Sequence, residues 1–180
     1  RAGSHFAPHF EQLLEFQHKM GNSVPVVTGM ATPSNHAETT VEVQNFVKWL
    51  VTEPKHKMHR YMEAVTQERL QSLEFYKQMA ADQGSPFLFL FGGARTWGPR
   101  QWDEFGKYDR IVAEKAAEYF PHIIWHVCGN NLPYGLDRIL ELPIKGLQYD
   151  MPMPQMKISY PDWFEQVAKK CAARKVCAMN

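Results

Sequence analysis

The sequence is poor in the features that mark several classes of protein. Its 180 residues contain three cysteines, Cys128, Cys171 and Cys177, an odd number that does not suit a disulfide scaffold. Free thiols or thiolate ligands in a reducing, cytoplasmic setting are the expectation instead. No apolar run reaches about 18 residues, so the sequence predicts no membrane-spanning helix. The first residues also lack the apolar core of a secretory signal.

Charge of one sign is lacking as well. The chain carries 20 basic and 19 acidic side chains, a formal net charge of +1. Such a balance gives no electrostatic attraction for nucleic acid or an anionic membrane, and neither is expected as a partner. The hydrophobic share of 44% is enough to build a core, which predicts a globular domain.

Short apolar runs alternate with longer amphipathic stretches along the chain. The apolar runs predict strands buried on both faces, at Val24–Met30, Phe87–Gly92, Ile123–Cys128, Gly146–Asp150 and Val176–Asn180. The amphipathic stretches predict helices at Phe6–Met20, Thr39–Leu50, Pro54–Ala81, Gln101–Phe120 and Tyr160–Ala173. This alternation predicts βαβ units and a parallel sheet, in a single α/β domain.

Such a sheet can close in two ways, as an open doubly wound sheet or as a (β/α)8 TIM-type barrel. The sequence has no glycine-rich phosphate loop after a strand, because Phe91-Gly92-Gly93-Ala94 lacks both the lysine and the glycine spacing. The barrel is therefore favoured. A complete barrel takes about 250 residues, so residues 1–180 are predicted to form the central portion of an incomplete barrel.

The order of these segments resembles the uroporphyrinogen decarboxylase-like superfamily, from about Phe10 to Asn180. Val24–Met30 is similar to the family's VP strand, and Trp97–Phe105 is similar to its "SP..F.EF" segment. Val176–Asn180 is similar to a strand that ends in GN, with Met179 in place of the glycine. The superfamily includes the metal-free decarboxylases and the zinc-dependent cobamide methyltransferases, both built on (β/α)8 barrels.

The most informative segment is Trp125-His126-Val127-Cys128-Gly129-Asn130. The methyltransferase branch carries H-x-C-G-N at this place, so the resemblance implies that His126 and Cys128 bind Zn²⁺. It further implies a corrinoid carried by a separate partner protein, and a small-molecule methyl donor or thiol acceptor. The family's third ligand is a cysteine well downstream; within this chain Cys177 is the candidate, although its strand position is deep.

The spacing of His126 and Cys128 suits a shared metal. Residues i and i+2 of a strand face the same side, roughly 6.6–6.8 Å apart at Cα. An imidazole and a thiolate can then reach one zinc at about 2.0–2.1 Å and 2.3 Å. Barrel enzymes place catalytic groups at this carboxyl end of the strands. Taken alone, an H-x-C pair on an apolar strand is more often a core histidine beside a buried thiol.

Other side chains near predicted strand ends are weaker candidates. Asp150 could bind substrate or a ligand histidine, or only cap the following loop. Contacts with substrate are also conceivable for His36, Arg95, Trp97 and Asn180, although packing, ion pairing or solvation is the commoner role of such residues. The proline- and methionine-rich segment Met151–Met156 predicts a loop over the barrel mouth, as a lid or a docking surface.

Three functions remain open from the sequence. The first is methyl transfer between a corrinoid protein and either a thiol such as coenzyme M or a methyl ether. The second is a metal-free decarboxylase of the uroporphyrinogen type, in which Cys128 would have no role. The third is a catalytically degenerate barrel fragment.

Overall fold

The structure, a computed structural model, describes residues 12, 15–21, 27–93, 95–127, 132–150 and 157–179. Its strands form one parallel sheet in the order β1-β2-β3-β4-β5. Their bounds are Thr28–Ala31 (β1), Phe87–Gly92 (β2), His122–Val127 (β3), Gly146–Tyr149 (β4) and Cys177–Met179 (β5). A doubly wound sheet reverses its strand order at a switch point. The unbroken sequential order is that of a partial barrel, which confirms the predicted α/β class.

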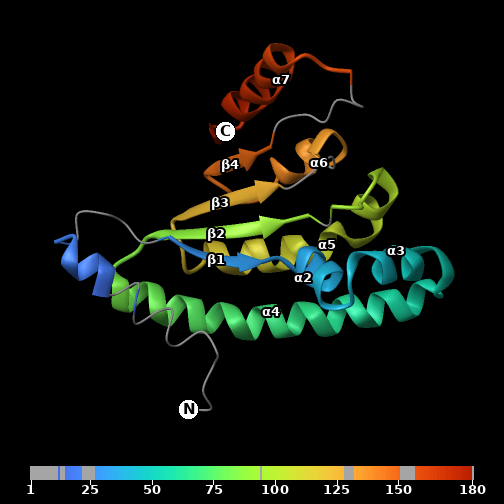
Figure 1. Cartoon of the computed structure of the whole chain (residues 1–180), viewed down its shortest axis with the longest axis horizontal. Coiled ribbons are helices and arrows are strands. Elements are labelled where there is room, and N and C mark those ends of the chain that lie inside the picture. The colour runs from blue at the N-terminus through green and yellow to red at the C-terminus, as the bar shows by residue number, and fades with distance from the viewer. Residues whose placement is uncertain are drawn as a thin grey trace.

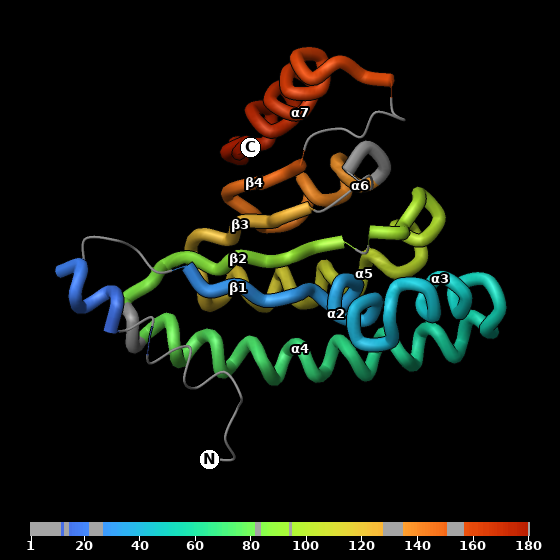
Figure 2. The backbone as a smooth tube through the Cα atoms, in the orientation of Figure 1, coloured from blue at the N-terminus to red at the C-terminus, as the bar shows by residue number. Residues whose placement is uncertain are grey.

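Helices connect the strands in turn. They are Pro33–Thr40 (α2), Val43–Thr52 (α3), Lys55–Gln83 (α4), Pro99–Ala117 (α5), Leu132–Ile139 (α6) and Tyr160–Ala173 (α7). Figure 1 shows α5 behind the sheet and the long α4 beside β1, while α7 lies beyond β4. The tube in Figure 2 shows the same arrangement, with β1 to β4 stacked between α4 below and α7 above. None of the described helices has the length and apolar character needed to cross a membrane.

The two faces of the sheet differ in burial. Toward the helices, Met30, Leu90, Trp125 and Leu147 are at most 1% exposed, and they form the centre of the core. Except for the buried Gly146, residues of the opposite face are half-buried or exposed, and Phe91 is 38% exposed. That uncovered face corresponds to the interior of a barrel, since side chains alternate between the two faces of a strand.

The core face brings Trp125 onto Gly92 at the carboxyl end of β2. A Cβ built on Gly92 would lie 1.9 Å from the indole of Trp125, closer than side chains can approach. Glycine is therefore required at this position. The close approach holds the ends of β2 and β3 together, next to His126.

Most predicted elements are confirmed, with differences at their ends. β2 and α7 have the predicted bounds, and the other strands differ by a few residues. The single helix predicted over Thr39–Leu50 is wrong, because α2 and α3 meet at Glu42, whose φ of +66° interrupts the helix. The helix α6 was not predicted, since its eight residues include Pro133 and Gly135. The predictions over Phe6–Phe10, Val24–Val26 and Met151–Met156 fall outside the described residues.

Candidate functional site

The parallel register aligns one row of side chains across the uncovered face. Ala31 pairs with Phe91, Phe91 with His126, His126 with Gln148, and Gln148 with Met179. Partners in register point to the same face of a sheet, and each of these residues is half-buried or exposed. The row lies near the carboxyl ends of the strands, the end at which barrel enzymes place their chemistry.

His126 is held by contacts from both neighbouring strands. Its Nδ1 lies 2.8 Å from Oε1 of Gln148 on β4. On the other side, Phe89 stacks against the imidazole with ring centroids 5.7 Å apart and planes at 29°. Phe91 meets it edge-on at 5.6 Å and 75°. The ring is thus fixed in the sheet's uncovered face, pointing where a barrel interior would lie.

Cys128, the predicted second ligand, lies outside the described residues, as does Asn180. Within the described part of the chain, no three His, Cys, Asp or Glu side chains gather as a metal site. The roles predicted for Cys128 and Asn180 remain predictions.

Cys177 is described and lies at the start of β5. It pairs with Gly146, which pairs with Ile124, two residues before His126 on β3. Two strand spacings and two residues separate the two backbones, roughly 10 Å across the strands and 6.6 Å along them. The thiol is exposed and lies near the carbonyl of Ala178. This register does not favour Cys177 as a ligand beside His126.

Asp150 directly follows β4 and is exposed, at the same end of the sheet as His126. Its neighbour Tyr149 pairs with Val127, so the backbone of Asp150 continues past the His126–Gln148 pair. The position is compatible with the predicted contact to substrate or to a ligand, which remains a prediction.

The two candidate substrate-binding residues that follow β2, Trp97 and Arg95, have structural contacts. Trp97 is 2% exposed and packs edge-on against Trp102, with ring centroids 5.5 Å apart. Trp97 is a core residue in this structure, which does not suit the contact with substrate considered for it. Arg95 is exposed, and its backbone N–H donates to Oε2 of Glu38 at 2.6 Å. Burial raises the pKa of Glu38, opposed by Arg95.

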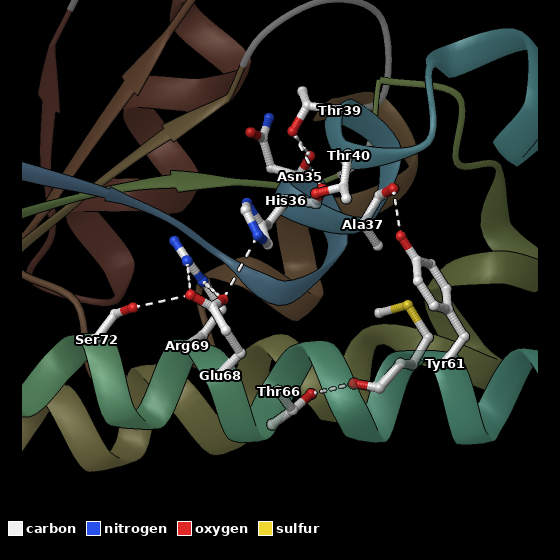
Figure 3. A network of polar contacts seen from close by, with 11 residues as sticks. Asn35, His36, Ala37, Thr39, Thr40, Tyr61, Thr66, Glu68, Arg69 and Ser72 are labelled. Atoms are coloured by element: carbon white, nitrogen blue, oxygen red, sulfur yellow. Dashed lines mark hydrogen bonds and ion pairs between the residues drawn. The ribbon is translucent and has the colours of Figure 1, made fainter. Parts of the chain in front are cut away.

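His36, a candidate near the end of the first predicted strand, lies in α2. Figure 3 shows its imidazole directed toward Glu68 of α4, with Nε2 and Oε2 3.5 Å apart. Glu68 also binds the neighbouring Arg69 and accepts a hydrogen bond from Ser72 at 3.1 Å. Burial is the largest cause that lowers the pKa of His36, and the charge of Arg69 is the second. The lowered pKa favours the neutral imidazole. His36 therefore joins α2 to α4, whereas His126 is bound by β2 and β4.

Two polar residues near the strand ends were missed from the sequence. Gln148 is the first, and its partnership with His126 depends on cross-strand register. The second is Asp109 of α5, fully buried, which accepts hydrogen bonds from Thr32 and Ser34 after β1. A usable signal existed for Asp109, because it follows Phe105 by four residues on the apolar side of a helix.

Comparisons with known proteins give one informative likeness. No family model matches the chain, and no curated protein matches it. Among solved structures, it is similar to a methyltransferase from Methanosarcina mazei, with a TM-score of 0.65 and 18% sequence identity. The alignment covers 95% of this chain and 47% of that one, so the chain spans about half the length of its neighbour. At this identity the likeness supports the partial barrel fold.

Proposed function

We propose that this chain contributes to a zinc- and corrinoid-dependent methyltransferase, with His126 and Cys128 as two of the protein ligands of zinc. The observation that carries the proposal is the setting of His126. Its imidazole lies on the less buried face of the sheet, near the carboxyl end of β3, and its Nδ1 is engaged by Gln148. A zinc-binding histidine is commonly held in this way through its other ring nitrogen.

The donor set suits zinc in its chemistry. Zinc in proteins is bound by imidazole nitrogen and thiolate sulfur, and a catalytic site retains an open position. When bound, the metal would supply Lewis acidity, either lowering the pKa of a thiol or polarising the oxygen of a methyl ether. The structural neighbour, a methyltransferase, supports methyl transfer as the reaction type.

The roles of the chain's own residues follow from their contacts. His126 would bind the zinc, while Gln148, Phe89 and Phe91 orient its ring. The two phenylalanines would also present apolar surface to a substrate beside the imidazole. A separate corrinoid protein is the proposed partner, exchanging the methyl group with the thiol or methyl ether.

Metal analysis of the purified protein tests the proposal. We expect stoichiometric zinc in the wild type and its loss in both His126→Ala and Cys128→Ala. His122→Ala and Cys177→Ala are matched controls that should keep the metal, because His122 is an exposed histidine of the same strand and Cys177 is an exposed thiol. Zinc that survives both ligand changes would refute the site. A metal-free wild type would favour the decarboxylase or the degenerate barrel.

A pair of activity assays then separates the two methyl-transfer reactions. One follows methyl transfer from methylcobalamin to coenzyme M, and the other follows demethylation of a methoxyarene with a corrinoid protein. The proposed function predicts zinc-dependent turnover in one of them, abolished by His126→Ala. Zinc binding without turnover in either assay would contradict the methyltransferase assignment.

A further inference from the structure

Gln148 lies directly opposite His126 in the pairing of β3 with β4. Both side chains emerge on the uncovered face, and Nδ1 of the imidazole lies 2.8 Å from Oε1 of the amide. An amide oxygen is an acceptor only, so a hydrogen bond at this distance requires Nδ1 to carry the proton and donate. The contact therefore selects one of the two neutral tautomers of His126.

Two aromatic rings restrict the same imidazole. Phe89 stacks on its face and Phe91 meets its edge, both from β2. Gln148 acts from the opposite neighbour, β4, so the ring is held between two strands. Stacking limits the tilt of the ring, while the hydrogen bond decides which nitrogen faces β4. The two kinds of contact together set the direction of the second nitrogen, Nε2.

We propose that Gln148 is a positioning residue that fixes the Nδ1–H tautomer of His126 and so makes Nε2 the zinc-binding nitrogen. This inference rests on the proposed function. Gln148 does not touch the metal in this scheme and acts through His126. Partners of this kind commonly change metal affinity by about 10- to 100-fold when they are removed.

The neutral amide has a consequence that a carboxylate would not have. A carboxylate at this position would push electron density onto the imidazole and make it a more basic ligand. An amide accepts the same hydrogen bond without adding negative charge beside the metal. The bound zinc would then remain the stronger Lewis acid, which suits activation of a thiol or a methyl ether.

Zinc affinity, measured by competition with a chromophoric chelator, provides the first test. Gln148→Met removes the acceptor at similar size and should weaken zinc binding by about 10- to 100-fold. Gln148→Glu restores an acceptor and should recover the affinity. Gln166→Met, a change of an exposed glutamine on α7, is the matched control and should leave affinity unchanged. A purely structural role of Gln148 would not be rescued by a charged glutamate.

The tautomer of His126 in the metal-free protein provides the second test, by ¹⁵N NMR of the imidazole. We expect the Nδ1–H form in the wild type, and this measurement does not depend on any variant folding. An Nε2–H form would overturn the inference. The inference would also be overturned if Gln148→Met bound zinc as tightly as the wild type while His126→Ala lost it. In that case the proposed function would stand. A wild type that binds no zinc contradicts the proposed function instead.

Discussion

Asp109 is the most buried carboxyl group near the candidate site. Its oxygens accept hydrogen bonds from Thr32 Oγ1 at 3.1 Å, from the backbone N–H of Ser34 at 2.8 Å and from Ser34 Oγ at 2.5 Å. Burial raises the pKa of this carboxyl to about 6, although the bonds from Ser34, Thr32 and Gly93 act to lower it. The residue ties α5 to the start of α2, and so secures the segments that follow β1 and β2.

The raised pKa makes the stability of the fold depend on pH. The folded-state pKa of about 6 exceeds the ordinary value of 3.8, so the folded protein binds this proton more tightly than the unfolded chain. The resulting stabilisation is complete below about pH 3.8 and is lost as pH rises to about 6. Relative to Asp109→Asn, the wild type should lose on the order of 3 kcal/mol of unfolding free energy across this range.

Urea unfolding of the two chelator-treated proteins, at several pH values between about 4 and 7, measures this difference. Metal-free protein is used because a histidine and a thiolate at a metal site would add their own pH dependence. Parallel stability profiles for wild type and Asp109→Asn would contradict the assigned shift. A wild type that gains stability over the variant as pH rises would contradict its sign.

Some residues of the candidate site could be predicted from the sequence, and others could not. His126 could be placed at the end of an inward-facing row, because a strand alternates its side chains and Trp125 marks the buried face. Its partner Gln148 could not, since the register between β3 and β4 is set by tertiary packing. Trp97 was a candidate for contact with substrate, but its indole packs against Trp102 in the core.

At the scale of elements, the junction of α2 and α3 holds a strained residue. Glu42 has φ +66° and ψ 139°, a conformation that residues with a Cβ rarely adopt. Glycine, which lacks a Cβ, adopts positive φ far more readily. The break turns the chain so that α3 can bury Phe46 while α2 packs on α4.

Glu42→Gly should therefore raise the free energy of unfolding, by on the order of 1 kcal/mol. Glu42→Ala is the control, because alanine removes the carboxylate and keeps the strained Cβ. Thermal and urea unfolding of both variants against wild type measure the effect. Equal destabilisation by both changes would show that the carboxylate, rather than the backbone conformation, determines the choice of residue here.

The elements themselves were predictable where local pattern and tertiary packing agree. β2 is apolar at nearly every position, and α7 is capped by Ser159, whose Oγ accepts a hydrogen bond from the N–H of Asp162 at 3.3 Å. No glycine, proline or asparagine marks the helix break at Glu42 in the sequence. α6 combines a short length with Pro133 and Gly135, so its helical form depends on packing, as when Trp102 approaches Gly135.

At the scale of the whole molecule, the described helices bury one face of the sheet more completely than the other. Neighbouring residues of β2 show the difference, since Leu90 is fully buried beneath the helices and Phe91 is 38% exposed on the other face. The similar methyltransferase is about twice as long as this chain, which spans 47% of it. The uncovered face, with Phe89, Phe91 and His126, is the face that a complete barrel would enclose.

One-sided packing predicts unequal costs for two changes on the same strand. In the 180-residue chain, Leu90→Ala should reduce the free energy of unfolding by about 2–5 kcal/mol, because it opens a cavity in a packed core. Phe91→Ala should cost clearly less, because its ring already contacts solvent. Urea unfolding of both variants provides the comparison. If Phe91→Ala reduced the free energy of unfolding as much as Leu90→Ala, the face that carries Phe91 would be covered in the folded protein.

If His126 and Cys128 bind zinc, the metal has both nitrogen and sulfur ligands. X-ray absorption at the zinc edge of the purified protein distinguishes these ligands. We expect a mixed set, with nitrogen at about 2.0–2.1 Å and sulfur at about 2.3 Å from the metal. In Cys128→Ala the sulfur contribution should fall, and in His126→Ala the imidazole signal should fall. A set of ligands without sulfur, or one unchanged in both variants, would contradict zinc binding by His126 and Cys128.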